Sequence, residues 1–174
     1  PLEPDATLVL NEVISDNWTS GHDLGVEFGD WLEIYNRGAE PQSLDCWSLS
    51  DSWSFDPQKG PRKQWYFPYG MMSLAPGDHL LVWCDNDTDC ETRKIDETTW
   101  ELHTSFQLNR SADFVQLLDP CGRVADFVMT GFQPRDISVG RFPDGEGTGA
   151  FLDPTPGEAN QPLGANRVHL LTSQ

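Results

Sequence analysis

The chain lacks any apolar stretch close to the roughly 20 residues that a membrane-spanning helix needs, so direct membrane insertion is not expected. It is also poor in basic residues: 11 Lys and Arg stand against 28 Asp and Glu, which gives a net charge of −17. Because nucleic-acid binding relies on Lys and Arg that displace counterions from phosphates, this balance predicts no nucleic-acid partner. The same charge disfavours an anionic membrane surface and favours solubility, cations or basic partners.

Motifs that carry catalysis or hold zinc are also missing. The sequence contains no CxxC, HExxH or His-x-His spacing, and no GxSxG, GxGxxG or P-loop. Gly145–Gly149 is rich in glycine, but no basic residue accompanies it to hold a phosphate. We therefore predict no catalytic residue, no zinc site and no enzymatic activity. The histidines are scattered: His22, His79, His103 and His169.

Short apolar runs between turn residues are what the sequence does contain. Hydrophobic residues make up 37% of the chain, with 7 Trp and 9 Phe, which suffices for a core. Asp30–Asn36 alternates with period two, as a half-buried strand does, and no segment keeps a helical period. These features predict an all-β, antiparallel β-sandwich. The expected strands are Leu8–Ile14, Asp30–Asn36, Leu44–Leu49, Gln64–Phe67, His79–Cys84, Glu101–Leu108, Phe114–Leu118, Val124–Met129 and Ser138–Phe142.

The cysteines Cys46, Cys84, Cys90 and Cys121 form an even set without zinc spacing. Such a set predicts two disulfides and an oxidising compartment, so we expect an extracellular or cell-surface location. Four cysteines allow three connectivities. Cys84 and Cys90 flank a short polar loop, which favours a Cys84–Cys90 bridge and leaves Cys46 to pair with Cys121. The alternative is four free, buried thiols in a cytosolic protein.

An acidic stretch follows His79–Cys84, with acids at alternate positions, as in the opening of an EF-hand calcium loop. The match fails further on, because Cys90 stands where that loop needs Gly and Asp96 stands where it needs Glu. A looser calcium site remains a hypothesis, against the competing interpretation of a solvated acidic loop. Its candidate ligands are Asp85, Asp87, Asp89 and Glu91.

The seven tryptophans exceed what one core usually needs. Trp31, Trp47 and Trp83 lie in predicted strands, and we expect them in the core. An exposed Trp can stack on a sugar ring or anchor a partner protein, although packing beneath loops is the competing interpretation. The surface candidates, in or near loops, are Trp18, Trp53, Trp65 and Trp100.

Several pieces spread over the chain occur in a specific order. They are Asn11–Val13, Gly29–Asn36, Leu44–Asp51, Leu74–Asp78, His79–Asp85, Asp119–Asp126, Gly140–Gly145 and Thr155–Asn160. Together they resemble the lamin-tail domain (LTD) of secreted and surface proteins, outside the animal nuclear lamins. The resemblance implies an immunoglobulin-like sandwich, usually without catalysis, that often accompanies other secreted domains. Cys46 and Cys121 depart from the family pattern, and a bridge between them would explain both departures.

We expect an N-terminal extension over residues 1–6, the sandwich over 7–160 and a linker or tail over 161–174. The expected function is a noncatalytic interaction or linker module, joined to other domains, that binds protein or glycan through loops. One alternative is a calcium-dependent module using the Asp85–Asp96 loop. Another is an accessory domain of a secreted hydrolase or kinase-like enzyme. A small enzyme using Asp30 and Glu33 is disfavoured, because strand alternation places these carboxylates on opposite faces.

Overall fold

The computed structural model describes residues 6–52, 55–56, 60–61, 63–71, 73–86, 92–97, 99–147 and 149–165. The named elements in this part of the chain are all β-strands. They are β1 (Leu8–Ile14), β2 (Trp31–Asn36), β3 (Ser48–Ser50), β4 (Phe55–Asp56), β5 (Gly60–Pro61), β6 (Trp65–Tyr66), β7 (His79–Trp83), β8 (Arg93–Lys94), β9 (Trp100–Glu101), β10 (Phe114–Leu118), β11 (Val124–Met129), β12 (Ser138–Gly140), β13 (Ala150–Asp153) and β14 (Gln161–Pro162).

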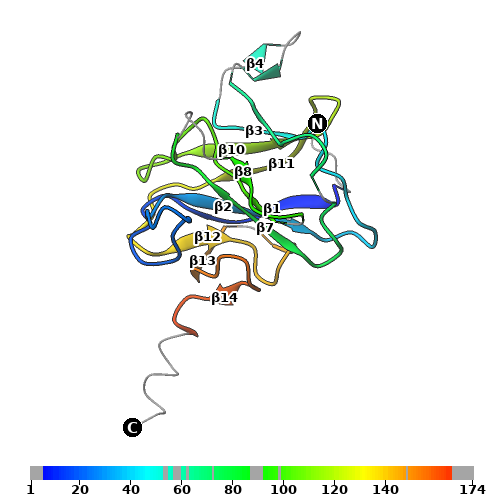
Figure 1. Ribbon diagram of the computed structural model, residues 1–174. Coiled ribbons are helices and arrows are strands. Elements are labelled where there is room, and N and C mark those ends of the chain that lie inside the picture. The colour runs from blue at the N-terminus through cyan, green and yellow to red at the C-terminus, as the bar shows by residue number, and fades with distance from the viewer. Residues whose placement is uncertain are drawn as a thin grey trace.

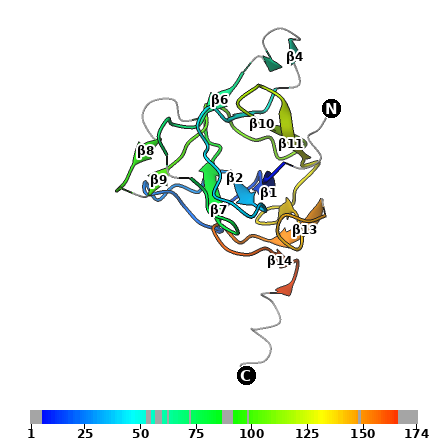
Figure 2. The same ribbon diagram turned by 90° about the vertical axis from the view of Figure 1, so that its right-hand side faces the viewer.

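The strands form two stacked layers (Figure 1). The larger sheet has the order β14-β13-β12-β1-β2-β7, and the smaller sheet has the order β11-β10-β3-β6. Every pairing between named strands is antiparallel. Two short pairs, β4–β5 and β8–β9, stand apart from these layers, and Figure 2 shows β8–β9 on the side away from β13. The predicted all-β antiparallel sandwich is therefore confirmed.

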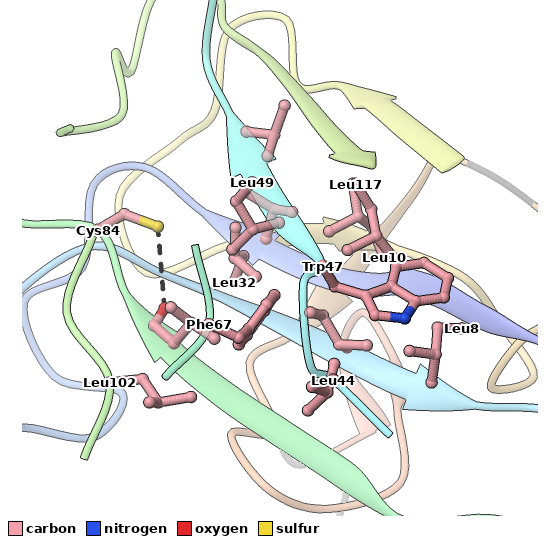
Figure 3. Close-up of a cluster of buried hydrophobic side chains, with 14 of the residues drawn as sticks. Leu8, Leu10, Leu32, Leu44, Trp47, Leu49, Phe67, Cys84, Leu102 and Leu117 are labelled. Atoms are coloured by element: carbon pink, nitrogen blue, oxygen red, sulfur yellow. Dashed lines mark hydrogen bonds between the residues drawn. The ribbon is translucent and has the colours of Figure 1, made fainter. Parts of the chain in front are cut away.

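The core lies between the two sheets, and strand alternation decides which side chains enter it. Leu32 points from β2 into a buried cluster with Leu49 of β3 and Leu117 of β10 (Figure 3). Ile34 of β2 belongs to the same cluster. Trp31 is one residue out of phase, so it packs on the opposite face of the sheet in a second cluster. The three tryptophans predicted for the core are all buried: Trp31, Trp47 and Trp83.

Two expected strands differ from the structure. Leu44–Leu49 is mostly a turn, because Trp47 N donates to Leu44 O over 3.0 Å and the strand starts only at Ser48. Glu101–Leu108 contributes a strand only at its first residue; its later residues form isolated bridges. Strands β13 and β14 were not expected, and β14 pairs Gln161 with Asp153 inside the segment expected to be a tail. These short strands depend on pairing partners rather than on their own periodicity.

The cysteines correct the disulfide prediction. Cys46, Cys84 and Cys121 are free thiols, so the expected Cys46–Cys121 bridge is wrong, and Cys84 has no sulfur partner. Cys90 lies outside the described residues. The Cys84 side chain points into the core, where its Sγ lies 3.8 Å from Val82 O (Figure 3). Burial raises the pKa of this thiol, so it remains protonated and behaves as a small apolar core residue.

A largely buried ion pair joins the two sheets. Arg141, directly after β12, donates from Nη2 to both carboxylate oxygens of Asp126 on β11 at 2.9 Å. Asp126 also accepts the Leu10 amide of β1 at 2.8 Å, and Arg141 Nε donates to Leu10 O at 3.1 Å. The pair therefore fixes the edge strand β11 to the centre of the larger sheet.

We expect Asp126→Ala to lower the free energy of unfolding by about 3 kcal/mol, because it leaves Arg141 and the Leu10 amide without their partner. Urea unfolding measures the change. The matched control is Arg123→Ala, which removes the ion pair between the exposed Arg123 side chain and Asp119 and should lower the free energy of unfolding by less than about 1 kcal/mol. Equal losses of unfolding free energy in the two variants would show that the Asp126–Arg141 pair stabilises the fold no more than the Arg123–Asp119 pair does.

Candidate functional site

The buried carboxylates of the larger sheet form a structural network rather than a catalytic pair. Glu12 on β1 and Glu33 on β2 are register partners, and both have 0% exposed surface. Glu12 accepts from the Ser138 hydroxyl and from Thr155 Oγ1. Glu33 accepts from Gly157 N at 2.7 Å. Burial raises the pKa of Glu12 to about 7 and that of Glu33 to about 8.

The same network connects sequence pieces that lie far apart in the chain. Asn11 donates to Glu33 and to Asp144, while Asn160 donates to the carbonyl oxygens of Asn11 and Arg141. Residues from four separate pieces therefore hydrogen-bond to one another beside β1. Because the two central glutamates are sealed from solvent, the network holds the turns onto the sheet and offers no access for a substrate.

Asp30 and Glu33 do not converge. Asp30 accepts from Asn17 N at 3.2 Å in a loop, whereas Glu33 belongs to the network around Gly157. Burial raises the pKa of Asp30 to about 6, but its surroundings share no group with those of Glu33. The structure thus agrees with the expectation that these two carboxylates do not act together.

Three loops meet at one end of the sandwich, which we call the loop end. They are residues 15–30 between β1 and β2, residues 102–113 before β10, and residues 130–137 after β11 (Figure 1, left side). Gln133 joins them: it is fully buried, accepts from Ser15 N at 2.6 Å and donates to Val13 O at 2.9 Å. Its own backbone N donates to Arg110 O at 3.1 Å. The loops therefore form one connected surface.

Trp18 stands at the loop end, 57% exposed but held in place on several sides. Its Nε1 donates to Asp16 Oδ1 at 3.0 Å, and its backbone N donates to Asp136 Oδ1 at 2.7 Å. The Arg135 guanidinium lies over the ring, 4.1 Å from its centroid. Such cation–π contacts stabilise by about 0.5–1 kcal/mol at exposed sites. The indole is therefore an ordered platform in water.

A second exposed aromatic lies on the same surface. Phe132 is 61% exposed, and the Arg110 guanidinium lies 5.8 Å from its ring centroid. Arg110 Nη1 and Arg135 Nε both approach Asp16 Oδ2, at 3.4 and 3.8 Å. One buried carboxylate thus positions both arginines. We call the set Trp18, Arg110, Phe132 and Arg135 the aromatic–arginine face.

A shallow hollow of about 520 Å³ lies beside this face. Much of its polar lining already serves the loops. Asn17 donates from Nδ2 to Gly29 O at 2.8 Å, and Asn109 Oδ1 accepts from Ser111 N at 2.9 Å. What the hollow offers a ligand is therefore mainly its shape, the indole of Trp18 and the guanidinium of Arg110.

The four tryptophans that the sequence analysis names as surface candidates lie in different environments. Trp18 is exposed. Trp65 and Trp100 pack against the main core, and the ring of Trp65 meets Phe67 edge-on at 4.8 Å. Trp53 lies outside the described residues. Arg110, Phe132 and Arg135 carry no local sequence signal, because loops distant in the chain bring them to Trp18.

The predicted calcium ligands are only partly described. Asp87, Asp89 and Glu91 lie outside the described residues. Asp85 lies at the loop end, where its Oδ2 is 2.7 Å from His103 Nδ1. Its described partner is thus a histidine from the segment after β9.

The stacked antiparallel sheets define a β-sandwich of the immunoglobulin-like class. Residues 2–131 match the Lamin Tail Domain family, and the chain belongs to that family. The resemblance seen in the ordered sequence pieces is thereby confirmed. A comparison with curated proteins finds no match. Within the described residues, no helix has the length and apolar character needed to cross a membrane.

Proposed function

We propose that this domain is a noncatalytic interaction module of an extracellular or cell-surface protein. It docks a partner protein through the aromatic–arginine face at the loop end. The observation that carries the proposal is Trp18, an indole more than half exposed yet fixed by Asp16, Asp136 and Arg135. Fixing a contact residue before binding reduces the entropy lost on association.

The composition of the face supports a protein partner. Trp and Arg are enriched among the residues that dominate the binding energy of protein interfaces. In a chain with only 11 Lys and Arg, two arginines lie beside two exposed aromatics. A glycan would need free polar groups around the indole, whereas Asn17 and Asn109 are used within the loops. We therefore favour a protein over a glycan.

We expect Trp18→Ala to weaken partner binding by about 30-fold or more, since removal of a central interface Trp costs about 2 kcal/mol or more. The wild-type domain is immobilised to capture partners from the extracellular fraction of its source, and the affinity of the captured protein is then measured by biolayer interferometry. The matched control is Tyr69→Ala. Tyr69 is 84% exposed and lies away from the loop end, next to Gly70, which donates to Asp45.

Comparison of Trp18→Ala with Tyr69→Ala shows whether binding depends on the aromatic–arginine face. Binding that survives Tyr69→Ala and is lost in Trp18→Ala supports the proposal. Equal affinities for wild type and Trp18→Ala would contradict it. A glycan array run in parallel tests the other ligand class. Glycan binding that depends on Trp18, with no protein captured, would contradict the protein partner and show that the ligand is a glycan.

A further inference from the structure

Strand β11 has one edge that no other strand covers in the described part of the chain, because β11 ends the smaller sheet. Thr130 N, one residue past β11, donates across to Asp113 O, one residue before β10, at 3.1 Å. Bonded and non-bonded pairs alternate in an antiparallel ladder, so Val128 bonds to β10, whereas Phe127 and Met129 direct their N–H and C=O groups to the free edge. This edge therefore offers main-chain donors and acceptors to another strand.

The larger sheet extends beyond β11. Strand β11 lies over β1, where Asp126 accepts the Leu10 amide at 2.8 Å, and β12 and β13 follow next to β1 in the larger sheet. Figure 2 shows β11 and β13 on the same side of the sandwich. The register places Phe151 of β13 beside Val139, which lies beside the core residue Val13, on the face turned toward the smaller sheet. Phe151 is nonetheless 48% exposed, because no described strand of the smaller sheet lies over it.

A hollow of about 410 Å³ lies where a further strand of the smaller sheet would pack. The two charged side chains in its lining, Asp126 and Arg141, neutralise each other. Gly140 and Gly149 have no side chains to fill it, so there is room for the side chains of an added strand. Both sheets contribute to the lining, which consists of Leu10, Asp126–Met129, Gly140, Arg141 and Gly149.

The sequence of β11 does not protect this edge. Exposed edge strands usually carry Lys or Pro, which prevent pairing with another chain. Strand β11 has neither, and its exposed side chains Phe127 and Met129 are apolar. The geometry fits a second copy of this chain or an extended segment of another protein. The net charge of −17 favours a basic segment, because a second copy brings the same charge and is repelled.

We propose that the free edge of β11 binds an extended basic segment of a partner protein as an additional antiparallel strand. The main-chain groups of Phe127 and Met129 pair with it, as in other cases of strand addition. Alternate side chains of the segment point into the hollow and are apolar, whereas the intervening Lys or Arg side chains lie in water beside Phe127 and Met129. This surface is separate from the aromatic–arginine face, so the inference stands independently of the proposed function.

The test is isothermal titration calorimetry of the full chain with the synthetic peptide Lys-Val-Lys-Val-Lys-Val-Lys at low salt. We expect binding that weakens as salt is added, and at least about tenfold weaker binding of the acidic peptide Glu-Val-Glu-Val-Glu-Val-Glu. Two N-methylated forms of the basic peptide keep its charge and composition. Methylation of the lysine amides, which face β11 in an antiparallel pairing, should abolish binding, whereas methylation of the valine amides, which face away, should preserve it.

Variants of the protein locate the binding edge. Phe127→Lys should weaken binding of the basic peptide at least about tenfold, because it adds a like charge and removes an apolar contact. The matched control is Tyr69→Lys, which makes the same change in charge after β6, at the opposite edge of the smaller sheet, and should retain binding. Trp18→Ala should also retain it, so this proposal and the proposed function fail separately. The methylated peptides, used on the unmodified chain, keep the test decisive if Phe127→Lys folds poorly.

The proposal fails if the basic peptide does not bind, if the acidic peptide binds as tightly, or if the two methylated peptides bind equally well. Analytical ultracentrifugation tests the other occupant. A dimer of the unmodified chain that is lost in Phe127→Lys would overturn the basic segment and identify a second copy at β11.

Discussion

Replacing Gly140 with alanine is expected to lower the free energy of unfolding by about 3 kcal/mol or more, near the upper end of the range for overpacked sites. Gly140 lies on β12, opposite Glu12 of β1 and Ala150 of β13. An added Cβ would lie 2.3 Å from Asn11 O and 2.9 Å from Leu152 Cδ1. Asn11 O also accepts the Arg141 amide at 2.8 Å, so it cannot move away without opening the sheet.

Gly122→Ala is the matched control for this prediction. Gly122 has a φ of 73°, but nothing lies within 4 Å of its added Cβ, so the variant measures backbone strain without a clash. We expect it to lower the free energy of unfolding by about 1 kcal/mol. Chemical denaturation of both variants gives the comparison. A Gly140→Ala loss no larger than the Gly122→Ala loss would mean that the contact between β1 and β12 is looser than described.

The free energy of unfolding is expected to fall by a few kcal/mol as the pH rises from about 5 to about 8. Burial raises the pKa of Glu12 from 4.5 to about 7 and that of Glu33 from 4.5 to about 8. Below pH 4.5 both groups are protonated in the folded and the unfolded chain. Above it the unfolded chain releases these protons first, which favours unfolding until the folded groups ionise near pH 7 and 8.

Urea unfolding at pH 5 and pH 8 measures this dependence, with added salt to screen the general repulsion of a chain of net charge −17. Glu33→Gln removes one of the two titrations and should reduce the difference between the two pH values. A wild-type stability that rises with pH, or an identical difference in Glu33→Gln, would show that the glutamates of this network do not control it.

The layered fold could be predicted because its central strands carry their own signal. In Trp31 to Asn36 the core residues Leu32 and Ile34 alternate with Trp31, Glu33 and Tyr35, and β1, β7, β10 and β11 are largely apolar runs bounded by turn residues. Alternation also placed Glu33 away from the core residues Leu32 and Ile34, as the structure confirms. Where burial of one face of a sheet fixes the alternation of side chains, the sequence alone suffices to predict the strand.

The remaining elements depend on contacts that the sequence does not reveal locally. Ala150–Asp153 becomes β13 because Leu152 pairs with Ser138 and is fully buried, although its neighbourhood is rich in turn residues. The disulfide prediction from the cysteine count also failed, because it takes no account of where the tertiary structure directs each side chain. Parity and spacing suggest bridges, but they cannot show that Cys84 points into the core while Cys46 and Cys121 face solvent.

Only part of the candidate site could be found from the sequence. Trp18 is a surface candidate from the sequence because it lies in a polar, glycine-bearing loop between two expected strands. Phe132, Arg110 and Arg135 carry no such signal, because Gln133 and Asp16 bring them together through tertiary contacts.

Hydrogen–deuterium exchange on the domain bound to its captured partner tests the central claim, that the loop end is the docking surface. The account predicts slower amide exchange within residues 15–20, 107–111 and 131–137, and unchanged exchange along β11 and around Tyr69. Protection confined to the edge strand β11 or to the region of Tyr69, with the three loops unaffected, would contradict it.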